Sequence, residues 1–179
     1  MATLPDPIGS LDPQAKQVYD TMVATRGRID GMYGAMFNHP ALVEHVGQLG
    51  TYLRFGATLP GEIRELTTLL VARQQNAPYE WVKHAPPARK AGLSEDAIEA
   101  VREGKDLSSF SPLYPKIAQM VDLVLAEQSL PSDLQGALEK NLGLHGVLEL
   151  VILVGFYRMI AAFIFAFDVP LPSDSMEPF

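Results

Sequence analysis

The sequence predicts an all-α protein that forms a single domain over residues 1–179. No segment shows the sustained alternation of apolar and polar residues that is typical of a β-strand. Apolar residues instead recur at helical spacing, as Leu66, Leu69 and Leu70 do, and this spacing gathers them on one face of a helix. Prolines and glycines stand where such helices are expected to begin and end.

The first 55 residues are expected to hold two helices with an irregular segment between them. Asp12 is a favourable N-cap and Pro13 suits the first helical position, so a helix is predicted over residues 11–25. Residues 26–38 contain three glycines and predict an irregular or short-helical stretch. The His–Pro pair at 39–40 starts a second helix that runs to about Phe55.

The middle of the chain predicts three further helices with clear boundaries. Pro60 begins one that continues to about Gln75, and Pro78 opens the next. Gly92 ends that second helix, because glycine readily adopts the left-handed conformation found after a helix C-terminus. Ser94 then caps a short amphipathic helix.

The last third of the chain is also expected to be helical. A loop over residues 104–112 leads to helices at 113–128, 131–141 and 145–167. The proline-rich tail that follows is expected to be extended.

Residues 147–167 are long and apolar enough to raise the question of a membrane span. They contain Glu149 and Arg158, and charges at such depths are costly in lipid. We therefore expect a buried helix and no membrane partner. Because this helix is apolar on nearly all sides, it also predicts a homo-oligomer in which other subunits cover part of it.

The composition excludes several classes of function. The net charge of −7 argues against a nucleic-acid-binding protein, which normally carries a basic patch. The chain has no cysteine, which excludes disulfides, thiolate catalysis and cysteine-ligated metal sites. The N-terminus lacks a basic region followed by an apolar stretch, so no secretory signal is expected and a cytoplasmic location is predicted.

A faint internal repeat divides the chain into two related halves, at about 1–103 and about 113–170. Glu65 opens an apolar helix in the first half, and Glu149 opens a similar one in the second. When these two acids are aligned, the positions that differ are Glu80 and His84 in the first half, and Ile164 and Asp168 in the second. We therefore expect two helical hairpins, of which only the first carries a site; chance similarity of two apolar helices is the alternative.

Three ionisable residues in the first half are the candidate catalytic groups. Glu80 and His84 are four residues apart, so they share one face of their helix. Glu65 lies on the preceding helix, and two carboxylates with an imidazole on an apolar scaffold are typical of proton-transfer sites. The alternatives are a structural hydrogen bond for His84, an exposed helix pair for Glu80 and a helix-dipole contact for Glu65.

The spacing of these residues resembles the carboxymuconolactone decarboxylase and alkylhydroperoxidase D superfamily. Its peroxidase members carry a Glu, then Cys-x-x-Cys-x-x-x-His, with the Glu twelve residues before the first Cys. Glu65, Ala77, Glu80 and His84 stand at those positions here, so both cysteines are replaced. The Glu-Trp-x-x-His form looks like the decarboxylase branch, and the resemblance covers roughly residues 38–170.

The resemblance implies an alkylhydroperoxidase D-like helical bundle that assembles as a dimer, trimer or hexamer. It also implies a cofactor-independent lyase that decarboxylates a small carboxylated or lactone-type compound. His84 would be the general acid/base, Glu80 its partner and Glu65 a second relay carboxylate. Peroxide reduction is excluded, because it requires the missing cysteine pair.

Three neighbouring residues are predicted to contact the substrate, namely Tyr79, Trp81 and Arg64. Core packing is the alternative for the two aromatic residues. An anionic substrate needs a cationic anchor, and the arginines considered are Arg54, Arg64, Arg73 and Arg158. No metal or other cofactor is expected, because no further histidine stands at ligand spacing to complete a site.

Two alternatives to the decarboxylase remain open. The chain could be a non-catalytic ligand-binding or assembly protein that keeps the helical scaffold. It could also be an isomerase or hydrolase of a lactone that uses the same acid–base groups.

Overall fold

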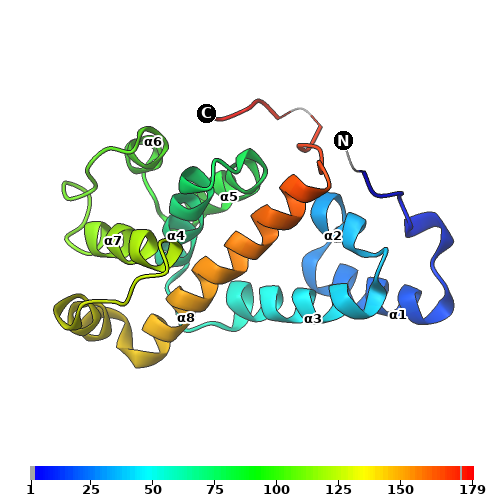
Figure 1. Cartoon of the computed structure of the whole chain (residues 1–179), viewed down its shortest axis with the longest axis horizontal. Coiled ribbons are helices and arrows are strands. Elements are labelled where there is room, and N and C mark those ends of the chain that lie inside the picture. The colour runs from blue at the N-terminus through cyan, green and yellow to red at the C-terminus, as the bar shows by residue number, and fades with distance from the viewer. Residues whose placement is uncertain (1–2, 174) are drawn as a thin grey trace.

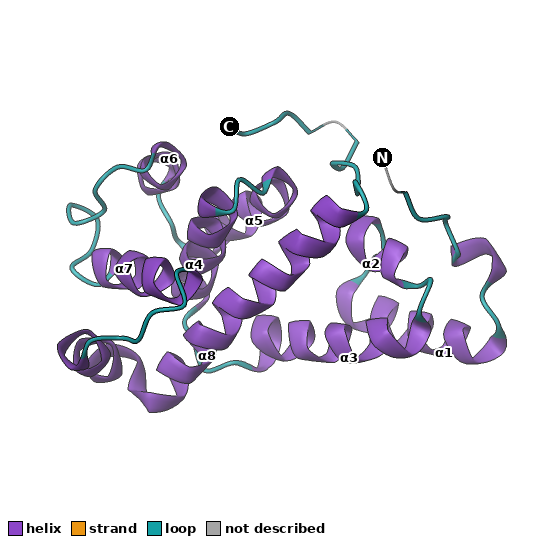
Figure 2. Ribbon diagram, viewed as in Figure 1, coloured by secondary structure: helices purple, strands orange, loops and turns teal. Residues whose placement is uncertain are grey.

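The computed structural model describes residues 3–173 and 175–179 and confirms the all-α prediction. These residues form eight α-helices, and no β-strand occurs among them, as Figure 2 shows. The helices are α1 (Pro13–Arg26), α2 (Gly31–Met36), α3 (Pro40–Thr51), α4 (Gly61–Gln74), α5 (Pro78–Ala91), α6 (Glu95–Glu103), α7 (Tyr114–Leu125) and α8 (Ser132–Ala166). A short 3₁₀ turn, η1 (Ile8–Ser10), precedes α1.

Helix α8 runs diagonally across the molecule and separates two groups of helices (Figure 1). Helices α1, α2 and α3 lie on one side of it, and α4 to α7 lie on the other. Helix α4 packs against α5, α6, α7 and α8, so it is the central element of its group. This arrangement brings the α4–α5 pair against α8, where the candidate residues meet.

The predicted helix ends are confirmed by their capping contacts. The Asp12 carboxylate accepts a hydrogen bond from the Ala15 backbone N–H at 2.8 Å, and Ser94 Oγ accepts one from the Ala97 N–H at 3.2 Å. Gly92 adopts φ +108° just after α5. Such caps satisfy backbone groups that a helix end leaves unpaired.

Two helices differ from the prediction. The helix expected to reach Phe55 ends at Thr51 and continues as a π-helical turn, η2 (Tyr52–Gly56). The two helices predicted at 131–141 and 145–167 are joined in α8, which bends at Gly143 where φ is +70°. Only glycine adopts that conformation readily, so the bend is placed by the sequence.

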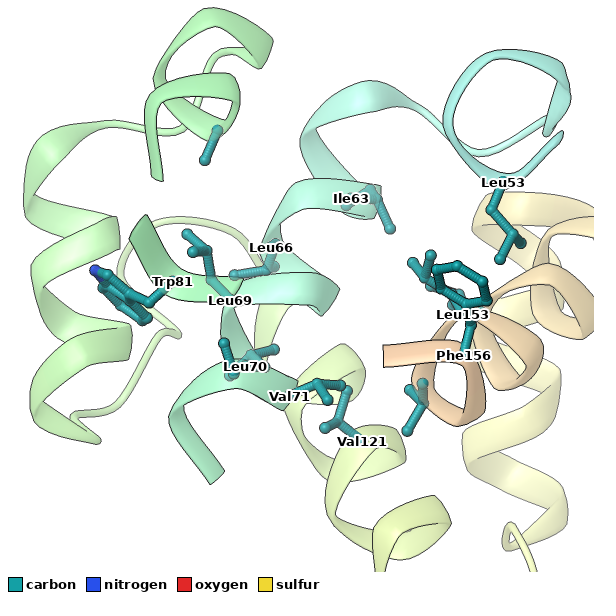
Figure 3. Packing of buried hydrophobic residues seen from close by; sticks show 14 of the residues in the cluster. Leu53, Ile63, Leu66, Leu69, Leu70, Val71, Trp81, Val121, Leu153 and Phe156 are labelled. Carbon is teal, nitrogen blue, oxygen red and sulfur yellow. The ribbon is translucent and has the colours of Figure 1, made fainter. Parts of the chain in front are cut away.

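Helix α4 is buried along most of its length. Leu66 and Leu69 have no exposed surface, and the hydroxyls of Thr67 and Thr68 are bonded within the helix to the carbonyls of Ile63 and Arg64. Figure 3 shows Leu66, Leu69 and other α4 side chains within the apolar cluster. Each fully buried leucine contributes about 2 kcal/mol, so this helix fixes the position of the acid it carries, Glu65.

Within the described chain, α8 is long and apolar enough to cross a membrane by length and composition alone. Half of its most apolar 18-residue window is buried inside the fold. A core helix of this kind passes the same test without lying in lipid.

Candidate functional site

A cavity with a volume of about 630 Å³ contains two of the predicted catalytic residues, Glu80 and His84. It lies between α5, α8, the segment joining α1 to α2, and the turn η2. Its apolar wall is formed by Met32, Val82, Pro86, Phe156 and Ile160, with Pro172 of the tail. The rest of its lining is polar or charged, and a hollow that combines an apolar wall with convergent polar side chains is typical of a small-molecule site.

His84 is held between a carboxylate and a tyrosine. Its Nδ1 lies 2.8 Å from Glu65 Oε2, and its Nε2 lies 3.0 Å from the Tyr157 hydroxyl. Helix α5 supplies His84, α4 supplies Glu65 and α8 supplies Tyr157, so three helices must pack together to form the arrangement. The imidazole is 14% exposed and meets the Tyr157 ring edge-on at 4.9 Å.

Glu65 is ionised and orients the imidazole. Burial raises the pKa of Glu65, but hydrogen bonding to His84 and the positive charges of His84 and Arg64 outweigh that effect and leave the pKa below its usual value. Arg64 Nε donates to Glu65 Oε1 at 3.1 Å. An ionised carboxylate can only accept, so His84 Nδ1 carries a proton, and in the neutral ring Nε2 accepts from Tyr157.

Glu80 is buried without a polar partner. The residue is 2% exposed, and within the described chain neither carboxylate oxygen has a hydrogen-bond partner. Burial raises the pKa of Glu80 from 4.5 to about 7. A carboxyl group with such a pKa exchanges its proton near neutral pH, which suits a general acid or base.

The predicted pairing of Glu80 with His84 is wrong. The two residues are four apart on α5, but the imidazole turns to Glu65 and Tyr157 on the neighbouring helices. An ionised carboxylate is the stronger partner, because charge-assisted hydrogen bonds are about twice as strong as neutral ones. Glu65 therefore takes the role expected of Glu80, and Glu80 stands apart as a separate acid.

Tyr157 is a site residue that the sequence pattern did not indicate. It lies in the apolar stretch of α8, where a tyrosine is readily taken for core packing. Burial raises its pKa well above the usual value, with a further contribution from the negative charge of Glu65. The hydroxyl therefore stays protonated and can donate to His84.

The three predicted substrate contacts have different positions. Tyr79 lines the cavity, and its hydroxyl accepts a hydrogen bond from the Met32 N–H at 3.2 Å. Gly31, at φ +51°, permits this contact, since a Cβ there would lie 1.9 Å from the hydroxyl oxygen. Trp81 does not line the cavity, and neither does Arg64, which instead pairs with Glu65. The predicted substrate contact therefore does not hold for these two residues in this cavity.

Trp81 belongs to the core and to the contact with the C-terminal tail. It is 5% exposed and meets the ring of Phe179 edge-on, with ring centroids 5.3 Å apart. Figure 3 labels it among the buried hydrophobic residues. The Arg73 guanidinium lies 5.2 Å from the centre of the same Phe179 ring, so Arg73 is also placed outside the cavity.

Charged residues at the cavity wall were mostly missed by the sequence pattern. Four cations line it, namely Arg26, Arg28, Arg54 and Lys83, together with the acid Asp30. Only Arg54 was among the arginines predicted as anchors. Arg26, Arg28 and Asp30 lie in the segment predicted to be irregular, where periodicity gives no signal. Lys83 lies on α5, three residues after Glu80.

No metal site is formed by the described residues, because no three side chains from His, Asp and Glu converge there. Both ring nitrogens of His84 already have partners. Glu80, His84 and Tyr157 therefore provide proton donors and acceptors of the kind that acid–base catalysis uses.

Comparisons with known proteins establish a likeness of fold. No family model matches the chain, and no curated protein sequence matches it. Among solved structures, the crystal structure of the debrominase Bmp8 in its apo form is similar, with a TM-score of 0.66. The match covers 90% of this chain and 87% of that one, at 14% sequence identity. At this identity the comparison supports the helical architecture alone.

Proposed function

We propose that this chain is a cofactor-independent acid–base enzyme of the carboxymuconolactone decarboxylase and alkylhydroperoxidase D superfamily. Its substrate would be a small carboxylated or lactone-type compound. The observation that supports this most directly is a buried, unpaired Glu80 in the same cavity as a His84 held by Glu65 and Tyr157. Perturbed titratable groups of this kind cluster at functional sites.

The proposed reaction breaks the bond between the substrate carbon and its carboxylate. The electron pair of that bond passes into a conjugated carbonyl group, CO₂ leaves, and an enolate remains. A proton must then be added to carbon. Each turnover thus consumes one proton and needs an acid close to the reacting carbon.

Glu80 is the proposed proton donor. Its pKa of about 7 keeps a large fraction of the group protonated at neutral pH. Once the proton has moved to carbon, the remaining carboxylate lies in an apolar wall, where its charge is costly. Glu80 therefore regains a proton from water after the product leaves.

His84 and Tyr157 are proposed to stabilise the enolate. In the proposed step Nε2 of His84 carries a proton, and this N–H donates a hydrogen bond to the Tyr157 oxygen. This turns the Tyr157 hydroxyl hydrogen toward the substrate oxygen, where negative charge develops. Donors aimed at developing charge are among the largest contributions to catalysis.

The test is release of CO₂ from a panel of small lactone acids by the wild-type protein and two variants. His84→Gln and Glu80→Gln should each lower kcat by about a hundredfold or more, in line with loss of a general acid or base. His45→Gln is the matched control, since His45 is an exposed histidine on α3 outside the cavity. Full activity in His84→Gln would sink the assignment.

The same panel separates the alternative functions. A lactone isomerase or hydrolase would convert the compounds without releasing CO₂, and its products would differ in mass by zero or one water. A ligand-binding or assembly protein would leave every compound unchanged. Debromination is not proposed for this chain, because the likeness to Bmp8 at 14% identity extends to fold alone.

We also propose that the chain forms a homo-oligomer through α8. Large apolar side chains are exposed at helical spacing along it, at Leu144, Leu148, Ile152 and Met159. Contiguous apolar surface of this kind is typical of a protein interface. Light scattering with size-exclusion chromatography checks the proposal, and a monomer of 19.6 kDa at all concentrations would contradict it.

A further inference from the structure

The cations of the cavity differ in whether they are neutralised. Arg28 Nε lies 2.9 Å from Asp30 Oδ2, and Lys83 Nζ lies 3.4 Å from Asp30 Oδ1. Arg26 and Arg54 make no ion pair with any carboxylate among the described residues. Asp30 offsets one of the two positive charges that it contacts, and Arg26 and Arg54 are the cavity cations without a carboxylate partner.

Arg26 is fixed in position by neutral partners. Its terminal nitrogen Nη2 donates to the Gly47 carbonyl and to Thr51 Oγ1, both at 3.1 Å. The guanidinium stacks over the Tyr33 ring, 4.4 Å from its centre. Its Nε is buried and has no hydrogen-bond partner within the described chain. A cation held without a counter-ion is ready to receive an anion from outside.

Gly50 lies where the Arg26 guanidinium, the Tyr33 hydroxyl and the Phe156 ring come together. A Cβ at this glycine would lie 2.5 Å from the Tyr33 hydroxyl, 2.9 Å from Arg26 Nη2 and 2.9 Å from the Phe156 ring. The absence of a side chain thus lets a phenol donor, a guanidinium and an apolar ring converge beside the cavity. A guanidinium next to an apolar ring suits an aromatic or unsaturated carboxylate.

Arg54 lines the cavity that contains both Tyr33 and the candidate catalytic residues. It projects from the turn η2. Its positive charge lowers the pKa of both Tyr33 and Tyr157, although burial raises each of them more. Arg54 therefore shares this cavity with Tyr33 and with Tyr157, whose hydroxyl contacts His84.

We infer that Arg26, Arg54 and Tyr33 form a carboxylate-binding subsite that orients a small unsaturated or ring-shaped acid with its body against Phe156. The inference rests on the proposed function, for which it supplies the anchor of an anionic substrate. The subsite places the bound compound between the two arginines and the Glu80–His84 wall. Arg54 is one of the four arginines that the sequence offered as anchors, and it is the one of them that lines this cavity.

Binding of 2-furoate, a small ring-shaped carboxylate, and of its uncharged methyl ester tests the inference by calorimetry. The wild-type protein should bind 2-furoate at least about tenfold more tightly than the ester, since a charge-assisted contact is lost in the ester. Arg54→Met should weaken 2-furoate binding by about tenfold and leave the ester unchanged. Inorganic phosphate, as a second anion, should bind more weakly than 2-furoate.

Arg28→Met is the matched control, because Arg28 lines the same cavity but is already paired with Asp30. It should change 2-furoate binding by less than about twofold. Equal effects of Arg54→Met and Arg28→Met would overturn the subsite, and so would equal binding of acid and ester or no binding of 2-furoate. Tighter binding of phosphate than of 2-furoate would overturn the carboxylate class.

The measurement requires no turnover. Loss of the decarboxylase proposal in the CO₂ assay would therefore leave the binding result intact, and failure of the subsite would leave the His84 and Glu80 assay unaffected. Arg54 is exposed and forms no ion pair within the described chain, and its guanidinium lies 5.2 Å from the centre of the exposed Phe55 ring. Its replacement therefore removes one surface contact and leaves the buried core unchanged.

Discussion

Glu149 on α8 and Glu80 on α5 are both buried carboxylates, at 7% and 2% exposure, but their surroundings are opposite. Glu149 accepts hydrogen bonds from the Tyr52 hydroxyl at 2.6 Å, from Thr58 through its backbone N–H and hydroxyl, and from the Leu59 N–H at 3.2 Å. Glu80 accepts none from the described chain. Protein donors therefore satisfy the carboxylate of Glu149, whereas the carboxyl group of Glu80 has no such donor.

The pKa values follow this difference. Burial raises the pKa of Glu149, but its hydrogen bonds outweigh that effect and leave the pKa below its usual value. Burial alone dominates at Glu80 and raises the pKa to about 7. Glu149 therefore acts as a permanent anion that fixes the segment leading into α4. Glu80 keeps its proton up to neutral pH, and burying this unpaired carboxyl group lowers the free energy of unfolding. A residue with only a structural role would not need this cost.

The largest expected effect is at Glu149. Glu149→Ala removes an acceptor from several buried donors, and we expect it to lower the free energy of unfolding by about 2–4 kcal/mol. Chemical denaturation measures this value. Glu44→Ala on α3 is the control, because Glu44 makes only a long contact of 3.5 Å to Gln48. A loss at Glu149 no larger than at Glu44 would show that the donors find other partners.

Glu80 should respond in the opposite direction. Glu80→Met removes an unpaired buried acid and keeps a similar volume, so we expect the free energy of unfolding at neutral pH to rise by about 1–2 kcal/mol. The same variant should lose CO₂ release in the assay of the lactone acids. If Glu80→Met instead destabilises the protein, the carboxyl group makes a stabilising contact and the contrast with Glu149 fails.

The smallest expected effect is on the pH dependence of stability. The unfolded chain releases the Glu80 proton near pH 4.5, while the folded protein keeps it until about pH 7. The folded state binds more protons in this window, so the Glu80 contribution to unfolding free energy falls as pH rises from about 4.5 to about 7. For Glu149, whose folded pKa is lowered, stability is instead lost as pH falls through that pKa.

Denaturation of the wild type and Glu80→Met between about pH 4 and pH 8 isolates the Glu80 contribution as their difference. That difference should widen in favour of the variant with rising pH and then level off. The wild type should lose stability at acid pH as Glu149 becomes protonated, and Glu149→Gln should lack this loss. A constant difference between the wild type and Glu80→Met across the range would contradict the raised pKa.

Much of the helical framework could be predicted because its signals are local. Asp12, Pro13 and Gly92 mark helix ends through contacts within a few residues of themselves. A break between the helical stretches 131–141 and 145–167 was predicted, but periodicity did not show that the two stretches join across a bend at Gly143. The π-helical turn after Thr51 was missed, since its Tyr52 and Thr58 contacts are to Glu149, far away in the sequence.

The candidate site was predicted in part. Glu65 and His84 do meet, as their positions on successive helices suggested. The i, i+4 spacing of Glu80 and His84 gave a wrong pairing, because a shared helix face does not fix where a side chain turns. Tyr157 was missed because it contacts His84 from 73 residues away. Arg26 was missed because its hydrogen-bond partners, Gly47 and Thr51, lie 21 and 25 residues away.

By itself, the sequence determined that the protein is all-α, where most helices begin and end, and that cysteine chemistry is excluded. These properties depend on composition and on interactions a few residues apart. Only the tertiary structure decided which buried acid is paired, which is left to hold a proton, and which arginines carry free charge. Those outcomes depend on the donors that packing brings to each carboxylate, and such donors come from segments distant in sequence, as Tyr52 and Thr58 do for Glu149.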